Sequence, residues 1–136
     1  MQKKMAAKMN FYSSVLKPLL FFLDAERAHS LAIIALKLGL YPRSFQSPDP
    51  ILKTKLWGLD FPTPIGMAAG FDKNAEVFGA LLKLGFGFVE TGTVTPLAQP
   101  GNDKPRMFRL PDDLGVINRL GFNNLGLSSY TQNIKK

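Results

Sequence analysis

The sequence predicts an α/β protein in which two helices precede a parallel strand–helix–strand unit. Apolar residues recur at helical spacing over residues 11–38, which indicates two short helices. Two compact apolar segments, 65–69 and 86–89, flank a further segment of helical periodicity at 74–84. A strand, a helix and a strand at this spacing form a right-handed βαβ unit with parallel strands.

The composition is that of an ordinary globular chain and excludes several classes of protein. The 136 residues are 46% hydrophobic and 20% charged, which suits a folded domain and not a disordered one. This length is well below the roughly 250 residues of a complete (β/α)₈ barrel. Cysteine is absent from the sequence, which excludes a disulfide scaffold, a thiolate metal site and a thiol nucleophile. One histidine, His29, is too few for a histidine-built metal site, so we expect no metal.

The net charge of +7 favours an anionic partner such as nucleic acid, acidic lipid headgroups or a small anion. Lys3, Lys4 and Lys8 gather ahead of the first apolar segment. We interpret them as a tail that seeks an anionic surface rather than as a nucleic-acid groove. The alternative is that they only keep the N-terminus solvated. Apolar stretches such as Pro18–Leu23 are far shorter than the ~18 residues of a membrane-spanning helix, and no secretory signal is expected.

The first two helices are predicted by their apolar stripes and by their capping residues. Asn10 is a candidate N-cap for a helix over 11–23. Asp24 ends that helix and caps the second, which runs over about 25–38 before Gly39 at the C′ position. Two such short helices cannot bury their own apolar surface, so we expect them to pack on something else.

A polar, proline-bearing linker follows the helices at residues 43–50. We predict a domain boundary there, between a helical segment at 1–45 and a second domain at 46–136. Alternation around Gly58 then predicts a short hairpin over 51–61.

Two more elements are expected after the βαβ unit. Residues 107–110 and 116–119 are candidates for the strands of a second hairpin. A third helix is predicted to begin near Leu127.

The first segment with chemical potential lies at residues 67–74, at the end of the first predicted parallel strand. Parallel α/β proteins keep their chemistry beyond the carboxyl ends of the strands. The small residues Ala68, Ala69 and Gly70 would let a flat ring or a phosphate approach the backbone, with Lys73 as a nearby cation. The alternative is that these small residues serve only helix–strand packing and that the lysine is solvated.

The second and third segments are rich in hydroxyl and amide groups. Residues 90–96 alternate threonines around Gly92, and their hydroxyls can bond phosphate or ring heteroatoms. Residues 117–124 place Asn118 and Asn123 where amide edges of a planar ligand could pair with them. The alternatives are that the threonines merely favour strand geometry and that the asparagines merely form turns.

Together and in this order, these segments resemble the N-terminal part of the class 2 dihydroorotate dehydrogenases. These are membrane-associated, quinone-reducing flavoenzymes of pyrimidine synthesis, and the resemblance covers residues 10–136. It implies an incomplete (β/α)₈ TIM barrel that binds FMN and follows a two-helix extension. The segments that carry it are Ala25–Leu31, Ala68–Lys73, Gly85–Pro96, Gln99–Asn102, Pro105–Pro111 and Ile117–Asn123.

The resemblance implies a reaction, its partners and a location. Dihydroorotate is oxidised to orotate with FMN and a ubiquinone-type quinone in de novo UMP biosynthesis. The helical extension would form the mouth of a quinone tunnel, with Lys17 and the lysines of the tail facing lipid headgroups. We therefore expect a monomer, peripheral to the cytoplasmic side of the cell (inner) membrane, and no nucleic-acid partner.

The resemblance also assigns residues to each site. The residues expected at FMN are Ala69, Gly70, Lys73 and Thr93. Those expected at the substrate are Lys73, Asn118, Arg119, Leu120, Gly121 and Phe122. His29 and Arg109 are expected to line the quinone tunnel. A cation at Lys73 would stabilise an orotate-like anion and the charge that develops on a reduced flavin.

No catalytic base is expected within this chain. In the family the base is a serine on a later barrel loop, which the resemblance puts beyond residue 136, and neither Ser128 nor Ser129 matches it. One alternative is therefore a catalytically inactive, truncated fragment that at most associates with membranes. Another is a small basic module that binds membranes or anions without a flavin, which the series of motifs disfavours.

Overall fold

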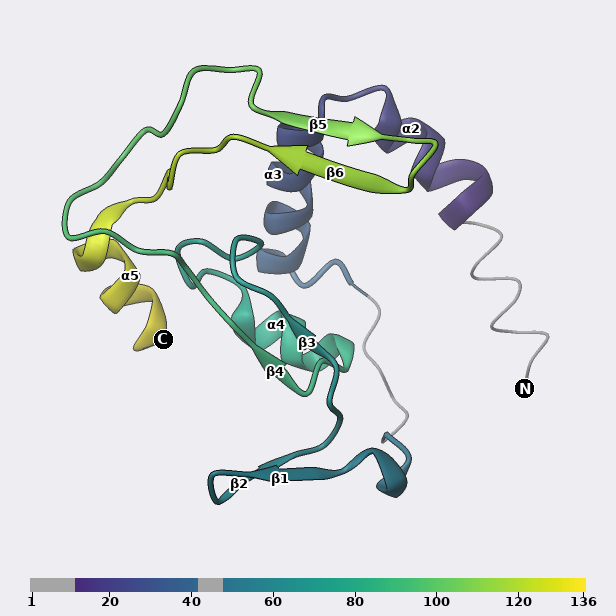
Figure 1. The fold of residues 1–136 in the computed structure, drawn as a ribbon, viewed down its shortest axis with the longest axis vertical. Coiled ribbons are helices and arrows are strands. Elements are labelled where there is room, and N and C mark those ends of the chain that lie inside the picture. The colour runs from purple at the N-terminus through teal and green to yellow at the C-terminus, as the bar shows by residue number, and fades with distance from the viewer. Residues whose placement is uncertain (1–11, 42–47) are drawn as a thin grey trace. The chain divides into compact units, whose positions relative to one another are not determined.

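The computed structural model describes residues 12–41 and 48–136 (Figure 1). The candidate cap Asn10, the lysines at positions 3, 4 and 8, and the predicted domain boundary at residue 45 lie outside the described residues. The chain forms two compact units. The first, unit 1, comprises the chain up to Leu31 together with Asp103–Arg119. The second, unit 2, comprises Ala32–Asn102 and Leu120–Lys136.

The described chain begins with helices, as predicted, but the first helical segment is π-helical at its start and α-helical at its end. A π-helical turn, η1 (Tyr12–Leu16), continues as the short α-helix α2 (Lys17–Phe21). The change coincides with Pro18, whose missing N–H suits the first turn of an α-helix and not its interior. Helix α3 (Ala25–Lys37) begins where the Asp24 Oδ1 accepts the backbone N–H of Arg27 at 2.9 Å, which confirms the predicted cap.

A hairpin completes unit 1. Strand β5 (Met107–Leu110) pairs antiparallel with β6 (Gly115–Asn118), with Met107 opposite Asn118 and Leu110 opposite Gly115. The predicted second hairpin is therefore confirmed, with its second strand beginning and ending one residue earlier than predicted.

Unit 2 contains the other predicted hairpin. A 3₁₀ turn, η2 (Pro50–Leu52), precedes strands β1 (Thr54–Leu56) and β2 (Leu59–Phe61), which pair antiparallel. The two loop residues, Trp57 and Gly58, have φ angles of +51° and +79°. Positive φ at both central residues is what a two-residue hairpin loop requires.

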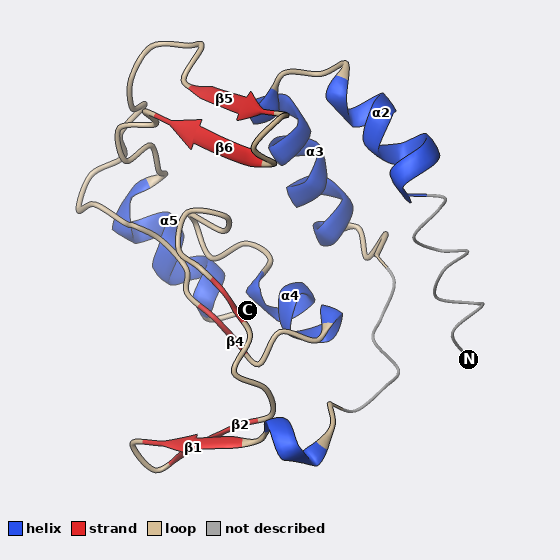
Figure 2. Ribbon diagram, turned by 45° about the vertical axis from the view of Figure 1, so that its right-hand side comes forward, coloured by secondary structure: helices blue, strands red, loops and turns tan. Residues whose placement is uncertain are grey.

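The βαβ unit has the parallel pairing that the sequence predicts. Strand β3 (Gly66–Met67) pairs parallel with β4 (Phe88–Val89), and α4 (Phe78–Leu84) connects them (Figure 2). Gly66 lies opposite Phe88, and a Cβ at Gly66 would come within 2.3 Å of the Phe88 ring. The Phe88 ring therefore occupies the space that a side chain at position 66 would need.

Helix α4 begins four residues later than the sequence pattern predicts. Ala75 has a φ of +54°, which no right-handed helix can contain. The carboxylate of Asp72 instead accepts the N–H groups of Glu76 and Val77 at 2.7 and 2.8 Å. The predicted start at residue 74 is thus wrong because the left-handed backbone at Ala75 interrupts the helix, while Asp72 bonds the N–H groups of the two residues that follow Ala75.

The apolar core of unit 2 is small. It consists of Leu36 from α3, Val77 and Leu81, with partly buried neighbours from the strands and loops packed against it. Helix α5 (Gly126–Ile134) follows and confirms the helix predicted near Leu127. This core fixes the β3–α4–β4 unit, whose strand ends carry the candidate site.

Candidate functional site

The loops that follow β3 and β4 are joined by backbone hydrogen bonds. The Gly70 N–H donates to the Gly92 carbonyl at 2.9 Å, and the Gly92 N–H donates to the Asp72 carbonyl at 3.0 Å. Parallel strands bring their carboxyl ends to one edge, and these bonds fix that edge. The structure therefore brings together Gly70, Lys73 and the Gly92–Thr93 peptide, which the sequence places about 20 residues apart.

The small-residue turn of this edge is open. Gly70 has a φ of +98°, and a Cβ built on it would meet nothing within 4 Å. Ala69 and Thr93 are exposed beside it in sequence and across the two loops. The space beside the Gly70 backbone is therefore open, and the approach of a planar ring to it stays a prediction.

Lys73 lies on this turn and not in open solvent. It is half-buried, and its ammonium donates to the Gly70 carbonyl at 2.6 Å. The alternative that this lysine is merely solvated is therefore not what the structure shows. The positive charge is held directly against the open glycine turn.

Sequence reasoning missed Asp72, the residue that shapes this turn. Its side chain is 1% exposed, and its two oxygens accept the two backbone donors ahead of α4 described above. Its own carbonyl receives the Gly92 N–H. An acidic residue shortly before a predicted helix is a capping signal, but only the structure shows that it also ties the two loops.

The three threonines after β4 differ in their surroundings. Thr91 is half-buried and its hydroxyl bonds the hydroxyl of Tyr130 from α5. The hydroxyl of Thr95 donates to the Leu97 carbonyl and also contacts Asn124. Thr93 is the exposed member of the three. Two of the hydroxyls that the sequence offers for a ligand thus have partners within the protein.

The predicted substrate turn is divided between the two units, and each half has its own support. In unit 1, Asn118 ends β6, while Arg119 donates its N–H to the Arg106 carbonyl at 2.9 Å and its guanidinium to the Pro105 carbonyl at 3.1 Å. These bonds extend the β5–β6 pairing by one residue.

In unit 2 the turn continues through Leu120, Gly121 and Phe122. The Leu120 carbonyl accepts the N–H of Asn102 at 3.1 Å. Gly121 has a φ of +71°, and a Cβ there would come within 2.8 Å of the Asn102 side chain. Phe122 also has a positive φ, +55°, and its side chain is 65% exposed. A glycine is required here both by the backbone angle and by the close approach of Asn102.

Asn124, which sequence reasoning did not single out as a site residue, is 6% exposed and fully engaged. Its amide nitrogen donates to the Phe122 carbonyl at 2.7 Å and to the Thr95 hydroxyl at 2.9 Å. Its amide oxygen accepts the N–H groups of Gly126 at 2.8 Å and of Thr95 at 3.3 Å. A polar residue just before a predicted helix signals a cap, yet its partners 29 residues away cannot be read from the sequence.

The two residues predicted for a quinone tunnel lie on different elements of unit 1. His29 is half-buried on α3. Arg109 on β5 donates to the carbonyls of Leu23 at 2.6 Å and Leu20 at 3.2 Å, and its guanidinium carbon lies 4.6 Å from the centre of the Phe21 ring. A cation at a helix C-terminus stabilises the exposed carbonyls, so Arg109 holds the end of α2.

A nearly buried ion pair joins α3 to the residue that precedes β5. Arg106 is 7% exposed and its guanidinium contacts both carboxylate oxygens of Glu26, at 2.6 to 3.2 Å. The ammonium of Lys104 adds a contact of 3.4 Å to the same carboxylate. The hydrogen bond from Arg106 lowers the pKa of Glu26 and, in return, raises that of Arg106.

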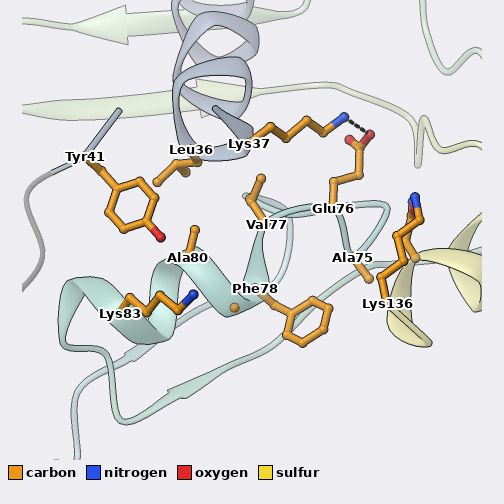
Figure 3. A pocket seen from close by; sticks show the side chains of 12 residues that line it. Leu36, Lys37, Tyr41, Ala75, Glu76, Val77, Phe78, Ala80, Lys83 and Lys136 are labelled. Carbon is orange, nitrogen blue, oxygen red and sulfur yellow. Dashed lines mark hydrogen bonds and ion pairs between the residues drawn. The ribbon is translucent and has the colours of Figure 1, made fainter. Parts of the chain in front are cut away.

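A cavity of about 500 Å³ lies in unit 2 (Figure 3). The end of α3, the start of α4 and the end of α5 line it, and the Lys37–Glu76 ion pair lies at its edge. No residue of the candidate flavin turn contributes to its lining. Within residues 12–41 and 48–136, no helix has the length and apolar character needed to cross a bilayer.

A family model described as dihydroorotate dehydrogenase matches residues 51–136. A dihydroorotate dehydrogenase (quinone) from Azorhizobium caulinodans is 54% identical over 128 residues, which cover 94% of this chain and 36% of that protein. One from Rhizobium rhizogenes is 65% identical over 107 residues, covering 79% and 30%. The chain therefore spans about a third of the length of these curated relatives.

Solved structures give the same result. The dihydroorotate dehydrogenase of Eimeria tenella in complex with ferulenol matches with a TM-score of 0.80 at 47% identity, over 82% of this chain and 30% of that one. The ligand-free enzyme from the same organism matches with a TM-score of 0.79 over 82% and 31%. These matches confirm the predicted α/β class. On the family model and the identities together, this chain belongs to the dihydroorotate dehydrogenase family.

Proposed function

We propose that this chain supplies part of a quinone-dependent dihydroorotate dehydrogenase, which oxidises dihydroorotate to orotate in pyrimidine (UMP) biosynthesis. The observation that carries the proposal is the joining of the loops after β3 and β4 through Gly70, Gly92 and Asp72. It creates one edge at which an open glycine turn and a cation meet. The relatives, which are named dihydroorotate dehydrogenase (quinone), support the choice of reaction.

The fold that accompanies this function is the first part of a (β/α)₈ barrel. In this proposal β3–α4–β4 is a βαβ unit of that barrel, within a domain over residues 46–136. Residues 1–45 form a helical extension that precedes it. The parallel pairing of Gly66 with Phe88 and of Met67 with Val89 supports this arrangement, because barrel strands are all parallel.

The open turn fits FMN as the cofactor. Ala69 and Gly70 would offer backbone to a planar ring, and a Cβ built on Gly70 would meet nothing within 4 Å. The exposed Thr93 supplies a hydroxyl, and Lys73 supplies a positive charge at the same edge. When bound, a flavin supplies the acceptor for the hydride that leaves dihydroorotate.

Lys73 and the turn at residues 118–122 are the substrate-facing groups in this proposal. The ammonium of Lys73 already lies against the turn carbonyl of Gly70, so it needs no rearrangement of the backbone to face an anion. A fixed cation in a partly desolvated position stabilises a carboxylate and developing negative charge better than a solvated one. Asn118, Arg119, Leu120, Gly121 and Phe122 would hold the ring of the substrate.

The helices of unit 1 are proposed to form the quinone entrance and the membrane contact. Phe22 is 86% exposed, and Leu19 is also exposed on the same helical segment, while Lys17 lies near the Phe21 ring. An apolar surface flanked by lysines suits the interfacial region of a bilayer. His29 and Arg109 would line the quinone path. We propose a monomer at the cytoplasmic face of the cell membrane.

Binding of FMN tests this function directly. The purified chain is titrated with FMN by flavin fluorescence, with Lys73→Ala as the test variant and Lys83→Ala on α4 as the matched control. We expect K73A to weaken FMN binding about tenfold, which corresponds to ~1.4 kcal/mol, and K83A to change it less than twofold. Equal losses in the two variants, or a wild-type chain without FMN affinity, would contradict the proposed site.

Turnover is measured on the same preparation. Dihydroorotate-dependent reduction of a ubiquinone analogue, with FMN added, would support the proposal that this chain has dihydroorotate dehydrogenase activity. A yellow preparation that retains FMN and shows no turnover supports the alternative, an inactive chain with a partly assembled site.

A further inference from the structure

Asn124 connects two segments to which the proposed function gives different tasks. Its amide nitrogen bonds the Phe122 carbonyl, in the turn proposed to face the substrate, at 2.7 Å. The same nitrogen bonds the hydroxyl of Thr95, two residues after the proposed flavin contact Thr93, at 2.9 Å. Backbone bonds between Asn124 and Gln99 in both directions, at 3.0 Å each, fix the peptide from which this side chain extends.

The turn at residues 120–122, which Asn124 bonds, has an unfavourable backbone conformation at Phe122. Phe122 has a φ of +55°, in the left-handed region where a side chain crowds the backbone. The Phe122 carbonyl is fixed by the Asn124 amide, with a longer contact of 3.4 Å from the Gln99 amide. On the other side, the Asn102 N–H fixes the Leu120 carbonyl. Two hydrogen bonds therefore set the conformation of residues 120–122. One comes from the backbone N–H of Asn102, and the other, at 2.7 Å, comes from the buried side chain of Asn124.

We infer that Asn124 is a positioning residue, which sets the turn at 120–122 relative to the loop that carries Thr93. The inference rests on the proposed function, in which the turn faces substrate and the loop faces flavin. Hydride transfer requires two reactants at near-contact distance, so a small error between their supports lowers productive binding. Asn124 itself is buried and acts through its neighbours.

The chemistry of an amide makes the inference testable. Asn124 donates toward Phe122 and Thr95 through its nitrogen, and it accepts from Gly126 through its oxygen. An aspartate of the same shape keeps the acceptor and loses the donor. Asn124→Asp should therefore free the turn while leaving the start of α5 bonded.

Two backbone amides report these two effects separately. The Asn102 N–H is bonded to the Leu120 carbonyl and reports on the turn, while the Gly126 N–H is bonded to the Asn124 oxygen and reports on the helix start. In N124D we expect hydrogen exchange at Asn102 to rise about tenfold and exchange at Gly126 to change less than twofold. A rise at both amides alike would mean general loosening and would overturn the inference.

Ligand affinities supply the functional readout. For the chain loaded with FMN, we expect N124D to weaken orotate binding about tenfold and FMN binding less than twofold. Thr95→Val is the matched control, because it removes the hydroxyl partner but keeps the bond from Asn124 to Phe122 and the bond from the Thr95 N–H to the Asn124 oxygen. The turn and the loop both stay bonded to Asn124 in this variant, so its orotate affinity should stay within twofold. If N124D does not fold, the uncharged and shorter Asn124→Ser is expected to show the same split between the two ligands.

The outcomes separate this inference from the function on which it rests. A wild-type chain that binds neither FMN nor orotate overturns both. A wild-type chain that binds both, with equal losses of the two affinities in N124D or an equal loss of orotate affinity in T95V, overturns the positioning role alone.

Discussion

The two units of the molecule bury different kinds of side chain. Among the described residues, the buried apolar ones, Leu36, Ala75, Val77 and Leu81, all belong to unit 2. The described part of unit 1 buries one side chain, that of Arg106, which is paired with Glu26. Apolar burial therefore stabilises the described part of unit 2, which also buries the polar residues Thr63, Asp72 and Asn124. In the described part of unit 1, charged hydrogen bonds at helix ends take the place of apolar burial.

The largest effect should come from the apolar core of unit 2. Leu81→Ala removes a fully buried side chain from the contact with Leu36 and Val77, and we expect the free energy of unfolding to fall by about 2–5 kcal/mol. Leu82→Ala, at the exposed neighbouring position of α4, is the control and should cost well under half as much. Urea unfolding followed by circular dichroism measures both. Similar losses in the two variants would mean that the Leu81 cluster does not stabilise the unit.

A smaller effect with a pH signature should come from unit 1. Because Arg106 lowers the pKa of Glu26, the ion pair contributes its full stability above the ordinary pKa of about 4.5. That contribution is lost as the pH falls through the lowered pKa of the folded state. We expect Glu26→Gln to cost about 1–3 kcal/mol at pH 7 and far less once the pH is below the lowered pKa of the folded state, where the wild-type carboxylate is protonated as well.

The control for this prediction is a second ion pair on α3, one that lies in unit 2. Lys37 pairs with Glu76 in unit 2, and the lysine is largely exposed. Exposed pairs contribute little, so Glu76→Gln should change the free energy of unfolding by about 0–1 kcal/mol. An E26Q variant whose loss does not decrease anywhere as the pH is lowered from 7 through the acid range would contradict the assignment of the pH dependence to the Glu26–Arg106 pair.

The elements were predictable where the signal is local. Asp24 lies three residues before the N–H that it caps, and alternation around Gly58 marks a two-residue hairpin. The start of α4 was not predictable, because Ala75 adopts a left-handed backbone, and the adjoining residues Glu76 and Val77 bond the Asp72 carboxylate. Helical periodicity cannot report such a bond, since it depends on the path of the chain before the helix.

The candidate site was predictable as a set of segments and not as a set of contacts. The sequence identifies the open turn at Gly70 and the cation at Lys73, and the structure joins that turn to Gly92. The sequence treats the three threonines alike, whereas Thr91 bonds Tyr130 from a helix 39 residues later. The partner of Glu26 is 80 residues away, so spacing alone could not reveal it.

The smallest of the three effects should come from Arg109, whose guanidinium binds two carbonyls at the end of α2. Arg109→Lys keeps the charge but removes the guanidinium that donates to the carbonyls of Leu20 and Leu23 at the same time. We therefore expect the free energy of unfolding to fall by about 1 kcal/mol. Arg27→Lys is the matched control; Arg27 is exposed and its pair with Asp24 should contribute less than ~0.5 kcal/mol. Hydrogen exchange at the Leu23 N–H, which bonds the Leu20 carbonyl, should rise in R109K and stay unchanged in R27K. If the two variants behave alike, the end of α2 is held by its own backbone bonds, and unit 1 depends on the Glu26–Arg106 pair alone among its charged contacts.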